Sequence, residues 1–278
     1  MVSATREFRN LIVEPTRFSL PPNPKIRRLP APVEKVGLAL KWGTRGFLDR
    51  ALAADPGNVD ALVGSAGADV VASVNIFVSD PTAAFAAAEA KLTKALSSVP
   101  DHARAHLYLG IVDIFTRRAA QGIAECEHAL VLNRNLAQAH SFIGRGKIFI
   151  GRAEETEAHI EEALRLSPRD TMAYTWMTYV GVAKNQLGSW EQAAAWLRRA
   201  IEANRNFPPA YFWLATALVQ LGRLDEARAA VKAGLALDPA FTISRARALW
   251  TAVSENPTYL AQLEPILEGM CKAGVPEQ

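Results

Sequence analysis

The chain has 278 residues, of which 50% are apolar and 21% charged, so it can bury a sizeable core and does not have the composition of a disordered protein. Its two cysteines, Cys126 and Cys271, exclude a disulfide scaffold and a four-cysteine zinc site, and they suit a reducing compartment. The net charge is +3, but it is unevenly distributed: residues 1–50 carry 10 Lys/Arg against 4 Asp/Glu, and residues 51–278 carry 21 against 24. The larger part of the chain is therefore nearly neutral, which disfavours nucleic acid as a partner.

The N-terminal 36 residues are expected to form an irregular, basic lead. A continuous helix is unfavourable there because six prolines interrupt the segment: Pro15, Pro21, Pro22, Pro24, Pro30 and Pro32. No apolar run follows the first charges, so the start does not resemble a secretory signal. The basic side chains could contact nucleic acid or acidic lipid, but no aromatic platform or amphipathic helix accompanies them, and we expect a solvated tail.

The next stretch predicts the start of a helical array. The sequence GFLDRALAADP (residues 46–56) predicts a second helix whose preceding helix is degenerate or missing. The interval from Pro56 to Pro100 is ten residues longer than the later repeats, and we expect the surplus as a long turn at residues 75–82. The apolar run from 63 to 78 is too short for a spanning helix and contains Asp69, so we expect no membrane span and a cytoplasmic protein.

A period of 34 residues governs the middle of the chain. A small residue followed by Leu or Ile recurs at spacings of 34, 34, 37 and 34: Ala95-Leu96, Ala129-Leu130, Ala163-Leu164, Ala200-Ile201 and Gly234-Leu235. Five residues after each small residue comes a helix stop, which is proline at 100, 168 and 239 and arginine at 134 and 205. A second phased series is Gly110, Gly144, Gly181 and Ala215, and a third is Gly151, Gly188 and Gly222.

Each unit is interpreted as a helix, a Gly-containing turn, a second helix and a stop. In residues 151–168 the apolar residues form one stripe and the glutamates lie mostly outside it. Small residues are needed where two helices approach to roughly 8–10 Å. The three extra residues of the unit from 168 to 205 predict a longer first helix or connector rather than a broken array.

This pattern resembles the tetratricopeptide repeat (TPR) over about residues 57–239. Arg134 and Arg205 depart from the closing proline of that family, and Gly122 stands where alanine is usual. The resemblance implies an all-α fold, a right-handed α-solenoid of helix-turn-helix repeats. We expect three parts: the lead at 1–36, the repeat array at 37–239 and C-terminal capping helices at 240–278, with helical patterns at about 242–254 and 258–272.

Several sequence segments, among them IEANRNFPPAYFWLATAL and NPTYLAQLEPILEGM, resemble the TPR arrays at the C-terminal end of bacterial class III adenylate/guanylate cyclases and winged-helix regulators. No cyclase catalytic domain or winged helix accompanies them here. The resemblance implies a bacterial signalling accessory. It leaves open a detached remnant that acts on a catalytic or DNA-binding domain in another chain.

The histidines, the glycine-rich segment and the cysteines that could suggest a chemical site are better explained as structural residues. His102 and His106 have the i, i+4 spacing of a metal site, but no third ligand is evident, and His106 occupies the same repeat position as His140. The sequence IGRGKIF (143–149) lacks the first glycine and the Ser/Thr of a phosphate loop. We expect Cys126 in the core and Cys271 nearer the surface. No nucleophile with a partnered base is evident, so we expect no enzyme, cofactor or metal.

The first helices of a TPR array line its groove, where a partner segment binds. By phase with the glycines, the predicted groove residues are Leu107, Ile111, Ile114, Ser141, Arg145, Ile148, Thr178, Val182, Asn185, Phe212, Thr216 and Val219. The family's carboxylate clamp needs Lys and Asn on this face, and those places hold other residues. We therefore expect an apolar segment of a partner protein, with Arg145 setting its register. We expect Phe212→Glu and Leu107→Glu to weaken capture without unfolding the chain.

Overall fold

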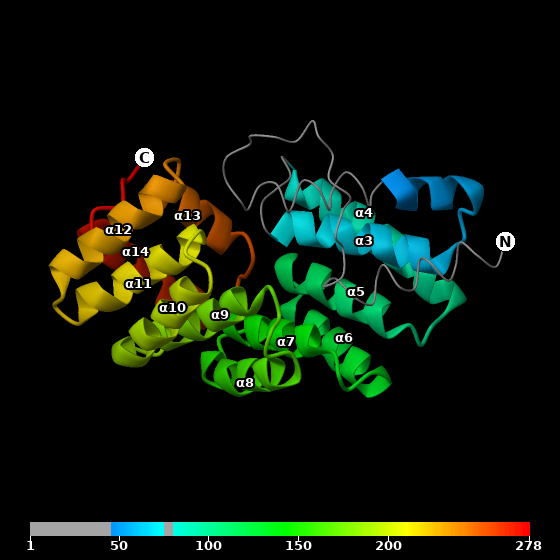
Figure 1. Ribbon diagram of the computed structural model, residues 1–278, viewed down its shortest axis with the longest axis horizontal. Coiled ribbons are helices and arrows are strands. Elements are labelled where there is room, and N and C mark those ends of the chain that lie inside the picture. Colours follow the sequence, from blue (N-terminus) through cyan, green and yellow to red (C-terminus); the bar gives the residue numbers. More distant parts are fainter. Residues whose placement is uncertain (1–45, 75–79) are drawn as a thin grey trace, which may run out of the picture. The chain divides into compact units, whose positions relative to one another are not determined.

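A computed structural model describes residues 46–74 and 80–278, which all belong to one compact unit, residues 37–278. Figure 1 shows α-helices following one another from α3 to α14, and the described residues contain no strand. The expectations for residues 1–36, and for the first half of a unit before residue 46, lie outside the described residues. Residues 46–54 are helical, as GFLDRALAADP predicts.

The helices pair as the repeat predicts. Each pair packs together, and the second helix of a pair then contacts the first helix of the next. The pairs are α3 (Val59–Val74) with α4 (Pro81–Ser98), α5 (Ala103–Phe115) with α6 (Ala119–Leu132), α7 (Ala137–Phe149) with α8 (Thr156–Leu166), α9 (Ala173–Gln186) with α10 (Trp190–Ala203), and α11 (Pro208–Gln220) with α12 (Leu224–Leu237). A short 3-10 helix, η1 (Ala153–Glu155), precedes α8, and α13 (Ile243–Thr251) and α14 (Pro257–Lys272) follow the array.

The predicted glycine turns use one hydrogen-bonding motif. Gly151, Gly188 and Gly222 have φ of 76°, 70° and 72°, and the next backbone N–H bonds back to a helix carbonyl five residues earlier. This is the Schellman ending of a helix, for which glycine is favoured because it has no Cβ. In the turn between α5 and α6, Arg117 occupies this position, with φ of 65°. Arg117 is the one non-glycine residue with positive φ in the described part of the chain.

The predicted small residues lie at close helix contacts, and the pair α5–α6 shows this most clearly. A Cβ built on Gly110 in α5 would lie 2.6 Å from the backbone oxygen of Gly122 in α6. A Cβ built on Gly122 would meet the backbone oxygen of Gly110 even more closely. The departure from alanine at 122 therefore has a structural cause, because both helices of this pair carry glycine at their contact.

The three extra residues of one unit are accommodated without a break, as predicted. The helix α9 has 14 residues, whereas α7 and α11 have 13 each. The connector before α9 runs from 167 to 172, two residues longer than the connector at 133–136. One extra residue is therefore in the helix and two are in the connector.

The first unit corrects one expectation. Its ten surplus residues were expected in a turn at 75–82, but α3 has 16 residues and α4 has 18, against 13 and 14 in the pair α5–α6. Residue 81 already begins α4, with Asp80 capping it by accepting a hydrogen bond from the N–H of Ala83 at 3.0 Å. Much of the surplus is thus helical, and residues 75–79 lie outside the described residues.

The core is continuous along the array. Cys126 is fully buried and Cys271 is exposed, as expected, and burial raises the pKa of the Cys126 thiol. Most of the apolar stretch 63–78 lies in α3, where Leu62, Val63 and Val70 are core residues. No helix in residues 46–74 and 80–278 is long and apolar enough to cross a membrane.

Candidate functional site

The first helices carry an aromatic residue at one repeated position, two residues before the close-packing small residue. These residues, Tyr108, Phe142, Tyr179 and Trp213, are called here the aromatic row, and they lie on α5, α7, α9 and α11. Two rings of the row, Phe142 and Tyr179 of successive units, lie with their centroids 6.4 Å apart. The sequence contains this signal at spacings of 34, 37 and 34, although none of these positions is among the predicted groove residues. We call the side of the first helices that carries the row the inner face.

A cation lies among aromatic rings on this face. The guanidinium carbon of Arg145 in α7 is 4.5 Å from the Phe149 ring centroid and 5.0 Å from that of Tyr179, both within cation–π range. Tyr259 of α14 completes the group, since its ring centroid is 5.5 Å from that of Phe149. Arg145, Phe149, Tyr179 and Tyr259 are called the Arg145 cluster below.

Within the Arg145 cluster, Phe149 and Tyr259 are buried, and Arg145 and Tyr179 are partly exposed. Burial lowers the pKa of Arg145 and raises that of Tyr259 to about 12. The guanidinium is still charged at pH 7 because its ordinary pKa is so high. Its Nε atom is buried without a hydrogen-bond partner, and no carboxylate among the described residues forms an ion pair with the guanidinium. The cluster is thus a site that favours an anion or a hydrogen-bond acceptor.

The segment from residue 252 to α14 folds back along the array as far as α7. Ser254 donates a 2.6 Å hydrogen bond to the carbonyl of Phe149, and the Asn256 amide donates to that of Ile150 at 3.1 Å. These carbonyls lie at the end of α7, where no intrahelical donor remains. Arg117 adds a hydrogen bond from Nε to the carbonyl of Ala252 and an ion pair with Glu255 at 2.5 Å.

The remainder of α14 lies against α11 and α9. The Thr216 hydroxyl of α11 donates to the carbonyl of Ile266 at 3.1 Å, and the Trp213 ring of the aromatic row stacks on Trp250 of α13 at 4.5 Å between centroids. The helix α14 contacts both α9 and α11. The sequence predicted a terminal cap at 240–278, but it gave no sign that this segment reaches α7 and Arg117.

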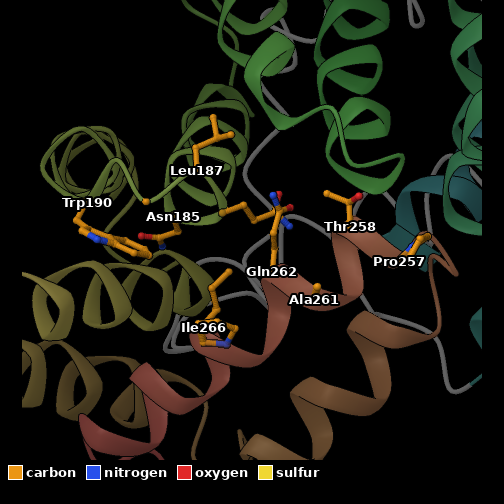
Figure 2. Close-up of a pocket in the computed structure, with 11 residues that line it drawn as sticks. Asn185, Leu187, Trp190, Pro257, Thr258, Ala261, Gln262 and Ile266 are labelled. Atoms are coloured by element: carbon orange, nitrogen blue, oxygen red, sulfur yellow. The ribbon is translucent and has the colours of Figure 1, made fainter.

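The contact between α9 and α14 is imperfect. A cavity of about 750 Å³ lies beside it, with α14 residues Thr258, Gln262 and Ile266 on one side and the end of α9 on the other (Figure 2). The Asn185 amide donates to the carbonyl of Trp213 at 2.9 Å, but its Oδ1 is buried and unpartnered. Both amide atoms of Gln186, and Oε1 of Gln262, are also buried without partners.

The structure buries most of the predicted groove residues. Of the twelve, Arg145 and Val219 are partly exposed, and the other ten are at most 4% exposed. One reason is that successive first helices contact one another directly: α3 with α5, α5 with α7, α7 with α9 and α9 with α11. The ten buried residues are Leu107, Ile111, Ile114, Ser141, Ile148, Thr178, Val182, Asn185, Phe212 and Thr216. Their role in binding a partner stays a prediction, and it requires a rearrangement that exposes them.

One associated expectation is wrong. Phe212 is 1% exposed, and its ring stacks on Phe241 at 3.8 Å, while Leu107 is also 1% exposed. A carboxylate at either position would be buried in an apolar core, so Phe212→Glu and Leu107→Glu would destabilise the array rather than test binding alone.

The histidines have structural partners. Nδ1 of His102 accepts a hydrogen bond from the N–H of Ala105 and so caps α5. His106 bonds Oε2 of Glu125 through Nδ1 at 2.6 Å and the carbonyl of Pro100 through Nε2 at 2.7 Å. Within the described ranges, no three His, Cys, Asp or Glu side chains gather as a metal site would require.

The pair His140 and His159, with ring centroids 6.0 Å apart, predicts a pH effect on stability. Burial lowers the pKa of both rings from 6.5, so the unfolded chain binds more protons just below pH 6.5. The free energy of unfolding should therefore fall as the pH falls from 6.5 through the folded pKa values. Urea unfolding at pH 7.5 and pH 5 should show a smaller drop for His159→Gln than for wild type. An equal drop in His159→Gln, with the exposed His128→Gln as control, would contradict this assignment.

Comparisons with known proteins agree with this architecture. A tetratricopeptide-repeat family profile matches residues 184–251, whereas no curated protein sequence matches significantly. A chain of the APC/C hetero-tetramer Cut9-Hcn1 aligns with a TM-score of 0.64 at 15% identity, covering 78% of this chain and 41% of that chain. PilW, a type IV pilus biogenesis factor, aligns with a TM-score of 0.54 at 19% identity, covering 73% and 90%.

A thermophilic TPR protein of Thermus thermophilus aligns with a TM-score of 0.53 at 18% identity, covering 72% of this chain and 99% of that chain. At these identities the likeness concerns the fold alone. With the repeat period and the helix pairing, it shows that the chain is an all-α solenoid of TPR-type repeats.

Proposed function

We propose that this chain is a noncatalytic scaffold or regulatory module that binds a segment of a partner protein on its inner face. The observation that carries the proposal is the Arg145 cluster, a cation held among aromatic rings without a carboxylate partner in the described part of the chain. Such a cation combines apolar contact area with one charged hydrogen-bonding group, which is the chemistry of an anchoring site in a protein interface.

The inner face offers little support for catalysis. Around the Arg145 cluster, the titratable side chains are one arginine and two tyrosines whose pKa values burial raises. A general acid–base pair needs groups that exchange protons near neutral pH, and these tyrosines do not. The nearly neutral charge of residues 51–278 likewise favours protein over nucleic acid as the partner.

The narrower roles rest on the sequence alone. A cytoplasmic location follows from the expected reducing compartment. A place in bacterial cyclic-nucleotide or transcriptional signalling, or as an accessory to a cyclase or winged-helix regulator in another chain, follows from the resemblance of the repeats to such arrays. These remain predictions. An upstream coding frame continuous with Met1 would support a detached regulator array.

The general function is tested by affinity capture from the native cytoplasm, read by mass spectrometry. Wild type should retain a partner that Arg145→Gln retains at least about fivefold less, because one charge-assisted contact is lost. Lys232→Gln, on the exposed surface of α12, is the matched control that also removes one positive charge. Capture of nothing above background by wild type would contradict the scaffold proposal.

A further inference from the structure

We propose that residues 252–272 are a displaceable, built-in occupant of the inner face, and that the face beneath them binds a partner helix carrying a carboxylate that pairs with Arg145. This inference rests on the proposed function and adds two features to it: the chemistry of the partner segment, and the element that must move before the segment binds.

The requirement for a carboxylate comes from the contrast between Arg145 and other buried or half-buried cations. Lys91 bonds Asp69 at 2.6 Å, Lys147 bonds Glu155 at 2.9 Å, and Lys184 bonds Glu157 at 2.6 Å. Arg145 has only aromatic rings, with Nε buried and unbonded. Aromatic faces attract a cation but accept no strong hydrogen bond from a guanidinium. A carboxylate is the group that satisfies both the charge and the open donor.

The helical form of the partner segment comes from the element that now occupies the site. The helix α14 places Tyr259 against Phe149 of the Arg145 cluster, and it places Ile266 and Gly269 against Thr216 of α11. A partner helix following the same path would present one residue to Arg145 and an apolar stripe to α11. This is the helix-in-groove mode of recognition.

The helix α14 buries its apolar face along this path, but the polar contacts beside it are incomplete. Its contact with α9 leaves Asn185, Gln186 and Gln262 with unpartnered amide atoms, and the cavity lies alongside. Pro265 interrupts α14 where it lines the cavity, so the carbonyl of Ala261 has no N–H four residues later to accept from. A helix without this proline, and with a carboxylate, has more favourable contacts to make on the same face.

Arg117 is one of several contacts that hold the segment, beside those of Ser254 and Asn256 at the end of α7 and those of residues 276–277 at the start of α13. Arg117 adopts the left-handed conformation that glycine adopts in the other turns, and its side chain holds the carbonyl of Ala252 and the carboxylate of Glu255. Arg117→Gly removes this grip and at the same time supplies the residue that the turn favours. The variant therefore loosens the segment without removing a stabilising feature from the turn.

The opposite variant locks the segment. A Cβ on Gly269 would lie 3.6 Å from Cβ of Thr216, within the range that a disulfide spans. Thr216→Cys with Gly269→Cys, in a Cys271→Ser background that removes the exposed thiol, should join α14 to α11 on oxidation and release it on reduction. Cys126 is buried and does not compete.

The probes are two fluorescein-labelled synthetic peptides with the sequence of residues 252–272, one native and one with Tyr259→Glu. Fluorescence polarisation with the full-length Arg117→Gly chain should show that the Tyr259→Glu peptide binds at least about tenfold tighter than the native one. In Arg117→Gly with Arg145→Gln this advantage should vanish, and with Arg145→Lys part of it should remain. The oxidised lock variant should bind neither peptide, and reduction should restore binding.

Absence of binding to the folded Arg117→Gly chain would overturn the proposal, because α14 would then be a permanent part of the core. Equal affinity of the two peptides, or an advantage that persists in Arg145→Gln, would overturn the carboxylate requirement. Failure of the proposed function would look different. If the oxidised lock variant still captures the cellular partner of wild type, the scaffold function stands and its site lies elsewhere.

Discussion

Replacing Gly122 with alanine is expected to destabilise the α5–α6 pair by about 1–3 kcal/mol, the typical cost of overpacking, although alanine is the usual residue of the repeat there. The new Cβ would meet the backbone oxygen of Gly110 and lie 2.7 Å from the backbone nitrogen of Ile114. Backbone atoms cannot rotate away as a side chain can, so the two helices must separate. Urea unfolding followed by circular dichroism measures the loss.

Gly64→Ala is the matched control for this substitution. Gly64 lies in the middle of α3, and its added Cβ would meet only the flexible end of the Leu48 side chain, at 3.0 Å. Alanine favours a helix over glycine by about 1 kcal/mol, so this variant should be neutral or more stable. A Gly122→Ala chain as stable as Gly64→Ala would contradict the close approach of α5 and α6.

Truncation of Phe212 to alanine is expected to cost about 3–5 kcal/mol, the range for a large buried aromatic residue. The ring is 1% exposed and stacks on Phe241 with 3.8 Å between ring centroids. It also lies against Gly234, where an added Cβ would come within 2.8 Å of a ring carbon of Phe212. The glycine at 234 makes room for the ring, so loss of the ring leaves a cavity that the backbone does not fill.

Thermal and urea unfolding of Phe212→Ala should show this loss, with Val131→Ala as control because Val131 is 82% exposed on α6. If Phe212→Ala unfolded like Val131→Ala, the inward orientation of Phe212 would be wrong. The prediction from sequence, that a charge at 212 would disturb only partner binding, would then regain its support.

The repeat architecture could be predicted from sequence because its signals are local. The turn glycines follow from the left-handed conformation that a Schellman ending needs, and Gly188 shows this with φ of 70°. The helix contacts within a unit join residues about a dozen apart, as at Gly110 and Gly122, so a fixed period records them. For the same reason, the three extra residues before residue 205 could be assigned to the first helix or its connector, although the sequence did not decide between the two.

The inner face could not be predicted in this way. The segment that covers it, residues 252–272, follows the repeats and does not share their 34-residue period. Ser254 bonds the carbonyl of Phe149 across 105 residues, and no repeat position marks either partner. Phase with the glycines placed Asn185 and Thr216 on the inner face, but phase does not show that α14 lies over them. The surplus residues of the first unit were placed wrongly for a related reason. Two longer helices and one longer turn give the same spacing between prolines, so the spacing does not distinguish them.

The independence of residues 252–272 from the rest of the array can be measured directly by native-state hydrogen exchange with mass spectrometry across a series of low denaturant concentrations. The amides of α14 should exchange through an opening of lower free energy and smaller denaturant dependence than those of α9 and α11, and Arg117→Gly should accelerate α14 alone. If α14 amides exchange only through the global unfolding that also exposes α9 and α11, the C-terminal helix is not a displaceable occupant of the inner face.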